Sequence, residues 1–352
     1  MERAVILSAG SVTDGQGDLS TVCEVERKLD ANGYAVKTLI IDPLKAGWNT
    51  PLQRDHFRSG CAPLEALRCA QKSLAEGTCE AAVIRGTDNL KTDFQADGEK
   101  RRQLMEIYGQ ESPLPHAYTA LAHEFIRIHG IAPSDFVRVA EKLYDNYVRT
   151  ARQDNHYRRP AEKWFESLTD LFRGVDCANP AVDFSGRVVL ATETVADAIG
   201  LPDRQRVHVL GVGVAQAGGD GPDYAGELAA YRHLMQAYAA ACKQAGFDYA
   251  GRYLSNEALL EVYSCYPVVP MAFLLATEMA RSFQEVESIV EQYPLTVTGG
   301  MNIAKAAWNN PALYALIVMY KKICSGEACS GAVHGNGGLG FKQGVAILGR
   351  RA

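Results

Sequence analysis

Long apolar runs are missing from this sequence of 352 residues, so we expect no membrane-spanning segment and no membrane partner. A basic excess is also missing, because the formal net charge at pH 7 is −5, which argues against nucleic acid as a partner. The start, MERAVILSAG, carries the acidic Glu2 and lacks the pattern of a signal peptide. The 9 cysteines are irregularly spaced, which is typical of reduced thiols. We therefore expect a cytoplasmic protein.

Two kinds of binding motif are incomplete. Gly211-Val212-Gly213 follows an expected strand, but the rest of a dinucleotide-binding fingerprint is absent. Cys324 and Cys329 have the wrong spacing for a zinc pair, and the sequence has no matching second pair. We therefore expect no metal site and no permanently bound cofactor.

The sequence does contain short apolar runs that alternate with amphipathic stretches. Runs typical of strands cover residues 4–7, 36–41, 81–85, 187–191, 207–214 and 259–263, and helical periodicity covers residues 19–32, about 62–76 and 224–244. Near the end, residues 295–298 have the pattern of a strand, residues 311–324 that of a helix, and a glycine-rich turn precedes a final strand. The alternation predicts an α/β fold.

A different kind of segment separates the two parts of this pattern. Residues 95–175 are charged, rich in Tyr and His, and helical in periodicity, which predicts a helical insertion or lid. We therefore expect residues 1–94 to begin an N-terminal half and residues 176–206 to complete it after the insertion. Residues 207–352 would then form a C-terminal half.

Two segments of the chain resemble each other. Residues 72–89 read KSLAEGTCEAAVIRGTDN, and residues 321–338 read KKICSGEACSGAVHGNGG. Both run from the end of a helix, through Gly and Cys, to a short strand and a glycine turn. Together with the strand–helix alternation on both sides of the insertion, they predict a duplicated α/β core.

Cys61 is the first candidate for chemistry. It lies after a loop and at the start of an expected helix, where free backbone N–H groups and the helix dipole stabilise a thiolate and can also hold an oxyanion. A cysteine so placed can be a nucleophile. The alternative interpretation is one of several small buried thiols.

His334 is the second candidate, in the turn Val333-His334-Gly335-Asn336-Gly337-Gly338 at a strand end. A histidine without bulky neighbours is well placed as a general base, although a hydrogen-bonded structural histidine is the alternative. Gly337 and Gly338 could bring backbone N–H groups to a carbonyl oxygen, or could simply form a tight turn.

Several blocks of sequence, taken in order, resemble the thiolase superfamily, specifically its acetyl-CoA acetyltransferase-like branch, which includes the thiolase part of sterol carrier protein x. The blocks are SGCAPLEALRCAQKSLAEGTCEAAVIRGTDN, RTARQDNHYRRP, SGRVVLATETVADAIGL, EVYSCYP, LTVTGG with WNNPALYAL, and GAVHGNGG with QGVAIL. The resemblance implies a five-layered αβαβα fold of two similar halves, a dimer, and coenzyme A thioesters as substrates. In that family a cysteine is acylated and an enolate attacks the acyl group, or the reverse.

The resemblance also assigns residues. The nucleophile falls on Cys61 if the family's loop is one residue shorter here, whereas an ungapped match places Gly60 there. Tyr263 stands where other members have an Asn or His that positions a water or a carbonyl oxygen. The family's Gly-His-Pro histidine falls near Ala306-Ala307, where the sequence has no histidine, and the second catalytic cysteine falls at or beside His334.

Four glycines are the expected contacts of the acyl-CoA. Gly299 and Gly300 follow the expected strand at residues 295–298, and Gly337 and Gly338 lie in the glycine-rich turn. Glycine allows the backbone to approach a ligand closely.

Three hypotheses follow. The main one is a thiolase-like acyltransferase that makes or breaks a carbon–carbon bond in an acyl-CoA through an acyl-Cys61 intermediate, with His334 as general acid/base and Tyr263 positioning an oxygen. The second is an aldolase that acts on a β-hydroxyacyl-CoA with tyrosine and histidine and no covalent intermediate. The third is a non-catalytic thiolase-like subunit. The expected partners are a second copy, a thiolase paralogue, or a small zinc-ribbon/OB-fold subunit.

Overall fold

The computed structural model describes residues 3–44, 50–153, 157–304 and 307–350. Its strands are β1 (Val5–Thr13), β2 (Gln16–Asp18), β3 (Val36–Ile41), β4 (His56–Phe57), β5 (Ala81–Asn89), β6 (Asp183–Ala191), β7 (Val207–Gln216), β8 (Ala258–Glu261), β9 (Ser330–Gly337) and β10 (Lys342–Gly349). They form one 10-stranded sheet in the order β4-β3-β5-β6-β1-β7-β10-β9-β8, and β2 pairs with β1 outside this path.

The helices of the α/β core are α1 (Ser20–Ala31), α2 (Ala62–Ala75), α7 (Glu193–Ala198), α8 (Ala225–Leu228), α9 (Arg232–Ala245), α10 (Tyr249–Leu254), α11 (Val268–Ala276), α12 (Phe283–Gln292) and α13 (Pro311–Ser325). The expected insertion contains α4 (Gly98–Met105), α5 (Leu114–His129), α6 (Pro133–Gln153) and the short 3-10 helices η2 (Glu162–Phe165) and η3 (Gly174–Asp176), after α3 (Leu90–Ala96). Block RTARQDNHYRRP crosses residues 154–156, which lie outside the described residues.

The sheet consists of two halves with the same topology. In the first half, β3 and β5 are parallel, and β6 runs antiparallel to both β5 and β1. In the second half, β8 and β9 are parallel, and β10 runs antiparallel to both β9 and β7. The halves meet where Val5 lies opposite His208 and Ile6 opposite Val207.

The two similar segments occupy equivalent places in this duplication. Residues 72–89 run from the end of α2 into β5, and residues 321–338 run from the end of α13 into β9. β5 and β9 also hold the same position in their halves, between a parallel and an antiparallel neighbour. The duplicated α/β core expected from the sequence is therefore confirmed.

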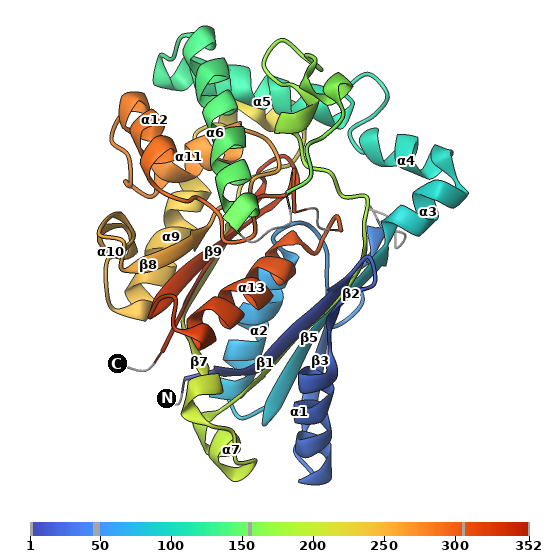
Figure 1. Ribbon diagram of the computed structural model, residues 1–352, viewed down its shortest axis with the longest axis vertical. Coiled ribbons are helices and arrows are strands. Elements are labelled where there is room, and N and C mark those ends of the chain that lie inside the picture. The colour runs from blue at the N-terminus through green and yellow to red at the C-terminus, as the bar shows by residue number, and fades with distance from the viewer. Residues whose placement is uncertain (1–2, 45–49, 154–156, 305–306, 351–352) are drawn as a thin grey trace.

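The halves enclose a central pair of helices, which completes five layers (Figure 1). Successive side chains of a strand point to opposite faces of a sheet. In β1, Ile6 packs in the central core with residues of α2 and α13, whereas Val5 and Leu7 pack outside with residues of α1 and α7. Helices α9 and α10 contribute to the outer core of the second half.

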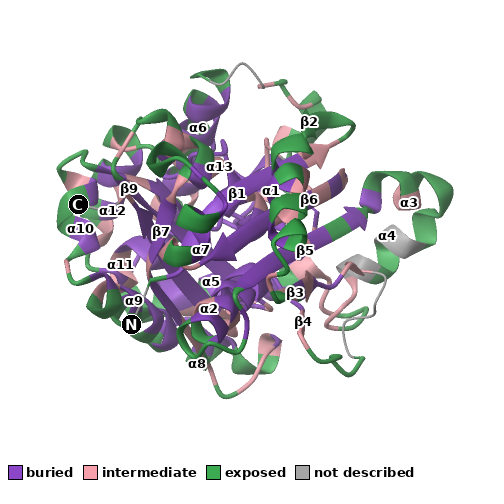
Figure 2. Cartoon of the chain, turned by 90° about the horizontal axis from the view of Figure 1, so that it is seen from below, coloured by how far each residue is buried: buried purple, intermediate pink, exposed green. Residues whose placement is uncertain are grey.

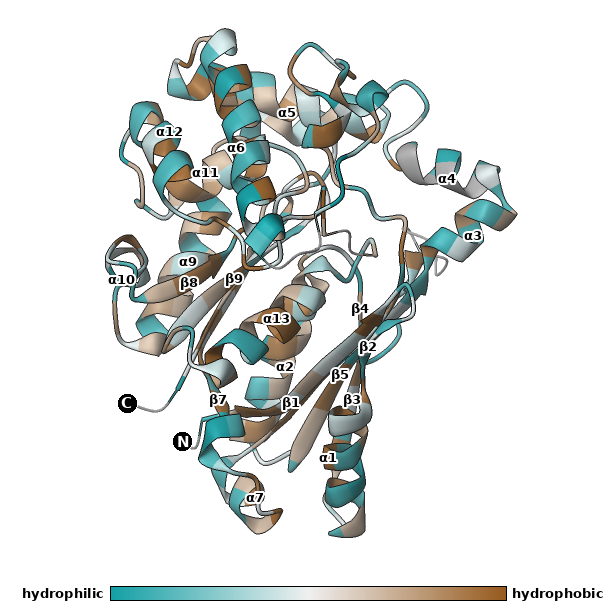
Figure 3. Ribbon diagram, in the orientation of Figure 1, coloured by the Kyte–Doolittle hydropathy of each residue, from teal (hydrophilic) through white to brown (hydrophobic). Residues whose placement is uncertain are grey.

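Burial follows these layers. The strands are mainly buried, while the outer helices carry exposed residues (Figure 2). Hydropathy has the same distribution, with apolar residues on the strands and α13 and polar residues on the outer helices (Figure 3). Helix α13 is buried on most sides, which explains why its sequence is apolar nearly all round.

The lid helices α5 and α6 are packed onto the second half, over α11 and α12 (Figure 1). Asn146 of α6 is fully buried, and its Nδ2 donates to the backbone oxygens of Val290 at 2.6 Å and Tyr293 at 2.7 Å. An ion-pair cluster joins Glu287 of α12 to Arg138 and Lys142 of α6. Among the described residues, none of the helices is long and apolar enough to cross a membrane.

The strand expected at residues 295–298 is absent, and the prediction is wrong because side chains from other parts of the chain take up its backbone donors. The backbone N–H of Leu295 donates to Asn146 Oδ1 at 3.1 Å, and those of Val297 and Thr298 donate to Glu261 Oε2 at 2.6 and 2.9 Å. Side chains therefore supply the acceptors that a neighbouring strand would provide. This stretch belongs to no sheet.

Other boundaries also differ from the expectation, and two of them have a clear physical reason. The helix expected over residues 224–244 is divided into α8 and α9 by Tyr231, whose φ of 46° lies in the left-handed region. Strand β1 continues through Gly10 instead of ending at Leu7, because the absent side chain leaves room for the Asp18 carbonyl oxygen. A Cβ at Gly10 would lie 2.7 Å from that oxygen.

Candidate active site

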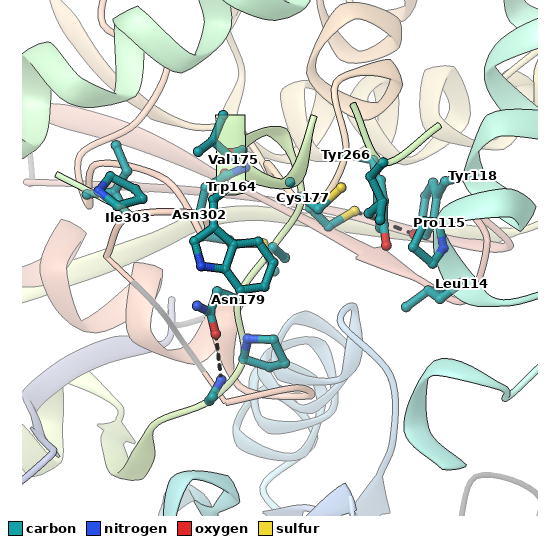
Figure 4. A pocket seen from close by; sticks show the side chains of 18 of the residues that line it. Leu114, Pro115, Tyr118, Trp164, Val175, Cys177, Asn179, Tyr266, Asn302 and Ile303 are labelled. Atoms are coloured by element: carbon teal, nitrogen blue, oxygen red, sulfur yellow. Dashed lines mark hydrogen bonds between the residues drawn. The ribbon is translucent and has the colours of Figure 1, made fainter. Parts of the chain in front are cut away.

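A cavity of about 470 Å³ lies between the helical insertion and the core. Its apolar lining includes Leu114, Trp164 and Ile303. The part of its lining formed by Tyr263 and Asn336 is called the floor below. In Figure 4, Trp164 and Ile303 lie on one side, and Leu114 lies on the other with Tyr118 and Tyr266. The size and the mixture of apolar walls with a few polar groups are typical of a small-molecule site.

Gly60 brings the N-terminal end of α2 to the cavity. The loop before α2 is held by a bond from Ser59 N to Asn309 Oδ1 at 3.2 Å, and Ser59 has a φ of 120°. Gly60 lines the cavity, and a Cβ added to it would lie 2.1 Å from the Tyr263 hydroxyl oxygen and 2.2 Å from the Asn336 backbone oxygen. A side chain at position 60 therefore has no room in this arrangement.

Tyr263 fills the space beside Gly60. Its side chain lines the cavity after the end of β8, and its hydroxyl has no hydrogen-bond partner in the described part of the chain. Burial raises the pKa of Tyr263 well above its ordinary value, so the hydroxyl is neutral and can donate a hydrogen bond. The structure thus places the neutral Tyr263 hydroxyl at the cavity, where it is available as a donor.

Cys61 is adjacent in sequence but lies elsewhere. It is the N-cap residue of α2, is 0% exposed, and is absent from the cavity lining. Its Sγ points at the sheet, where a Cβ added to Gly344 would lie 2.8 Å from it. Burial raises the pKa of the Cys61 thiol well above its ordinary value, which disfavours the thiolate despite the helix N-terminus.

His334 lies on the opposite face of the sheet from Cys61. Gly335 and Gly344 form a pair in β9 and β10, and Cys61 packs against both. His334 is next to Gly335 in β9, so its side chain points to the other face. The prediction that Cys61 and His334 act together is therefore wrong for this arrangement, because β9 and β10 separate the two side chains.

The ring of His334 is also fully engaged. His334 is 1% exposed, its Nδ1 accepts from Tyr263 N at 3.3 Å, and its Nε2 is 2.7 Å from Gln343 Oε1. Burial lowers the pKa of His334 to about 4, so the ring is neutral. It does not line the cavity, and it has no free nitrogen with which to exchange a proton with a substrate.

Of the four glycines expected to contact the acyl-CoA, only one lines the cavity. Gly338 lines the cavity, whereas Gly337 packs against Ser59. Gly299 and Gly300 do not line it, although the residues that follow them, Met301 to Ile303, do. Gly300 has a φ of 78°, and a Cβ there would lie 2.9 Å from the Tyr147 ring. Gly300 therefore accommodates the packing of Tyr147, and neither glycine of the pair lines the cavity.

Several cavity residues were not proposed as site residues from the sequence, and three of them carry polar side-chain atoms that contact one another. Tyr118 comes from α5, Cys265 follows Tyr263 by two residues, and Asn336 lies near the end of β9, in the stretch expected to be a glycine-rich turn. The Tyr118 hydroxyl donates to Gly338 O at 2.9 Å and accepts from Asn336 Nδ2 at 3.1 Å. Asn336 could have been found from its place in the quoted turn, whereas Tyr118 is part of no motif.

The cavity thiols are not activated. Burial raises the pKa of Cys265 to about 12, and it also raises the pKa of Cys177 above its ordinary value. Both line the cavity. Among the described residues, no group of three or more His, Cys, Asp or Glu side chains could hold a metal ion. The resemblance places the family's Gly-His-Pro histidine near Ala306-Ala307, of which Ala306 lies outside the described residues and Ala307 is buried.

Glu261 supports the stretch that leads to the cavity. It is 5% exposed, its Oε2 accepts from Val297 N and Thr298 N, and its Oε1 accepts from Thr298 Oγ1 at 2.6 Å. Burial raises the pKa of Glu261 to about 7 from 4.5. The folded protein therefore binds this proton more tightly than the unfolded chain does.

This shift predicts a specific pH dependence for Glu261→Gln. The stabilisation from the raised pKa is complete below pH 4.5 and is lost as the pH rises to about 7, a change of up to about 3 kcal/mol. Glutamine keeps the shape but cannot titrate. We expect the free energy of unfolding of Glu261→Gln, measured by urea denaturation, to rise relative to that of the wild type as the pH increases from 4.5 to 7. A constant difference across this range would contradict the prediction.

Comparison with known proteins supports the fold. No protein-family profile and no curated protein matches the sequence. A monomeric SCP2-thiolase-like protein type 1 from Mycobacterium smegmatis is similar in structure, with a TM-score of 0.70, 18% identity, and coverage of 99% of this chain and 78% of that chain. An Ltp2–ChsH2(DUF35) aldolase is similar with a TM-score of 0.71, 14% identity, and coverage of 99% and 98%.

Acetyl-CoA acetyltransferase from Syntrophomonas wolfei is also similar, with a TM-score of 0.62, 12% identity, and coverage of 100% of both chains. These three structures share a fold across nearly the whole of this chain. The chain therefore has the thiolase fold, and the αβαβα architecture expected from the resemblance to SCP2-type thiolases is confirmed.

Proposed function

We propose that this protein is an aldolase-type enzyme that cleaves or forms a carbon–carbon bond in a β-hydroxyacyl-CoA without an acyl-enzyme intermediate. One observation carries the proposal: the Tyr263 hydroxyl occupies the space in which a side chain at position 60 would lie. The Tyr263 hydroxyl, a hydrogen-bond donor, therefore lies beside the N-terminus of α2, in space that an acylated cysteine would have to occupy. The main expectation from the sequence, an acyltransferase acting through Cys61, fits this geometry less well.

The chemistry matches the groups on the cavity floor. In the cleavage direction, the bond between the α- and β-carbons breaks, the electron pair forms the enolate of a thioester, and the proton of the β-hydroxyl ends on the α-carbon. Negative charge therefore develops on the thioester oxygen. A buried, neutral tyrosine that donates a hydrogen bond to this oxygen stabilises the charge as it forms.

Coenzyme A as the carrier is supported by charges at the cavity. Arg158 and Arg159 are exposed and line it. Guanidinium groups bind phosphates through paired hydrogen bonds. The apolar wall with Leu114, Trp164 and Ile303 suits the acyl chain. We propose that the two arginines bind the phosphates of the carrier while the thioester reaches the floor.

The experiment that tests the proposal is a Cys61→Ala variant incubated with β-hydroxyacyl-CoA thioesters. We expect kcat to remain within about threefold of the wild-type value, because the Cys61 thiol does not touch the cavity. Liquid chromatography with mass spectrometry would follow the shorter acyl-CoA and the released carbonyl compound. Intact-protein mass spectrometry should show no acyl adduct on the wild type. An adduct that disappears in Cys61→Ala, together with loss of turnover, would overturn the proposal.

The acyl-Cys61 acyltransferase is the second candidate. It is favoured by the place of Cys61 at the N-terminal end of α2 and by the shared fold with an acetyl-CoA acetyltransferase. It requires the α2 loop to turn the Cys61 thiol from the sheet into the cavity. Its signature is the adduct described above, so the same measurement separates the two reactions.

A second polypeptide is also part of the proposal for this protein. One structural neighbour is an aldolase composed of Ltp2 and ChsH2(DUF35). We propose that this chain works with a second polypeptide, either another thiolase-like chain or a small zinc-ribbon/OB-fold subunit. Full turnover by the purified chain alone would contradict this partnership, whereas turnover that needs a co-purified subunit would support it.

A further inference from the structure

A line of hydrogen bonds runs from the backbone of Tyr263 to the floor of the cavity. Tyr263 N contacts His334 Nδ1 at 3.3 Å, and His334 Nε2 contacts Gln343 Oε1 at 2.7 Å. Gln343 Nε2 contacts Asn336 Oδ1 at 2.6 Å, and Asn336 Nδ2 contacts the Tyr118 hydroxyl at 3.1 Å. The three side chains between the ends are at most 2% exposed, so water does not compete for these bonds.

Two backbone groups determine the direction of this line. A backbone N–H can only donate, so His334 Nδ1 must accept from Tyr263, and the proton of the neutral ring must be on Nε2. A backbone carbonyl can only accept, so the Gln343 atom that lies 3.0 Å from Gly340 O must be Nε2. The proton on His334 Nε2 needs an acceptor, so the amide oxygen of Gln343 must face His334. The bond from Gln343 Nε2 to Gly340 O requires the same orientation of the amide.

The orientation of Asn336 follows from that of Gln343. Because Gln343 presents its NH₂ group to Asn336, the atom of Asn336 that receives it must be the amide oxygen. The NH₂ group of Asn336 therefore faces the cavity. One of its hydrogens goes to the Tyr118 hydroxyl, which itself donates to Gly338 O at 2.9 Å. The other has only a weak contact, with Cys265 Sγ at 3.9 Å.

We infer that Asn336 is a second catalytic donor, whose NH₂ group binds the thioester oxygen together with the Tyr263 hydroxyl, and that Gln343 and His334 are positioning residues that orient it. This inference rests on the proposed function. A substrate oxygen would replace the weak contact of Asn336 with Cys265 Sγ and leave the bond to Tyr118 in place. His334 then acts through the location of its proton and exchanges none with the substrate.

Burial makes this arrangement costly to reverse. If the Asn336 amide turned over, its NH₂ group would face the NH₂ group of Gln343, and its oxygen would face the cavity. Leaving one buried donor without an acceptor costs about 1–3 kcal/mol. An amide oxygen at the floor would also repel the thioester oxygen. The low pKa of His334, caused by burial, keeps the ring in the neutral form that the line requires.

The first test needs no turnover. Calorimetry would compare acetyl-CoA with S-ethyl-CoA, a thioether that lacks the carbonyl oxygen. We expect Asn336→Leu to lower the affinity for acetyl-CoA by about tenfold, the value of one hydrogen bond, and to leave that for S-ethyl-CoA unchanged. Equal loss for both probes, or a wild type that does not discriminate between them, would overturn the inference.

The second test separates orientation from simple support of the fold. Gln343→Met removes the amide but keeps the side-chain length, and Gln244→Met is the control, since Gln244 bonds only to the backbone of Val212. We expect Gln343→Met to lower discrimination between the two probes as Asn336→Leu does, with no further loss in the double variant. Additive losses, or an equal loss in the Gln244→Met control, would contradict the positioning role.

A third measurement keeps the inference falsifiable if a variant fails to fold. Nitrogen-15 NMR of histidine-labelled wild type reports which ring nitrogen of His334 carries the proton, and we expect Nε2 at pH 7. A proton on Nδ1, or a doubly protonated ring, would overturn the direction of the line. If the NMR and binding results agree with the inference while no β-hydroxyacyl-CoA is cleaved, the proposed reaction fails and Asn336 remains a thioester-binding donor.

Discussion

Tyr263→Phe is expected to lower kcat for cleavage of a β-hydroxyacyl-CoA by about 10²- to 10³-fold, with a much smaller change in KM. The hydroxyl is neutral, lines the cavity and has no hydrogen-bond partner among the described residues, so its removal costs the fold no internal hydrogen bond. The loss falls mainly on kcat because the donor gains most of its strength as charge develops on the thioester oxygen. Steady-state kinetics on the purified variant would measure it.

Tyr293→Phe is the matched control for that experiment. Its hydroxyl donates to Leu254 O at 3.0 Å, and Tyr293 does not line the cavity. We expect the control to keep wild-type kcat even if its stability falls slightly. If Tyr263→Phe retains wild-type kcat, or if it loses no more than Tyr293→Phe, Tyr263 is not the donor and the aldolase proposal loses its main support.

Gly60→Ala is expected to abolish most activity by a steric route. The new Cβ would lie 2.1 Å from the Tyr263 hydroxyl and 2.2 Å from Asn336 O, so Tyr263 or the loop must move. Overpacking of this kind typically costs about 1–3 kcal/mol of stability. We expect kcat to fall by at least about 10²-fold, as in the loss of the Tyr263 donor, because the hydroxyl no longer reaches the thioester oxygen.

A double-mutant cycle tests whether contact with Tyr263 causes the stability cost of Gly60→Ala. In a Tyr263→Leu background the side chain no longer reaches Gly60, so the stability cost of Gly60→Ala should shrink, with a coupling energy of about 0.5–3 kcal/mol. Gly98→Ala is the control, because a Cβ added there meets no atom within 4 Å. Urea denaturation of the variants would give the values. Additive costs for Gly60→Ala and Tyr263→Leu would show that the two residues do not compete for the same space.

The duplication of the fold explains why Cys61 is buried. Cys61 and Asn310 are the N-cap residues of α2 and α13, the two central helices. Cys61 packs against Gly335 of β9, and Asn310 packs against Gly86 of β5, where a Cβ would lie 1.8 Å from Asn310 Oδ1. Both residues therefore have the same packing role, where a helix start meets a glycine of the neighbouring strand. The position itself does not require a reactive side chain.

Much of the architecture could be predicted from local pattern. Apolar runs and helical periodicity depend on residues close in sequence, and the similarity of residues 72–89 to residues 321–338 indicated the duplication before any coordinates. The prediction was wrong at residues 295–298, whose backbone donors are taken up by Asn146 and Glu261. Those acceptors lie far away in the sequence, so no local pattern could reveal them.

The sequence by itself determined the α/β core with its two similar halves and the helical insertion. Only the tertiary structure decided which candidate groups share a cavity. Cys61 was credible from its place at a helix start and His334 from its glycine-rich turn, yet β9 and β10 place them on opposite faces of one sheet. The physical reason is that adjacent residues of a strand point in opposite directions, so Gly335 meets Cys61 while Asn336 reaches the cavity.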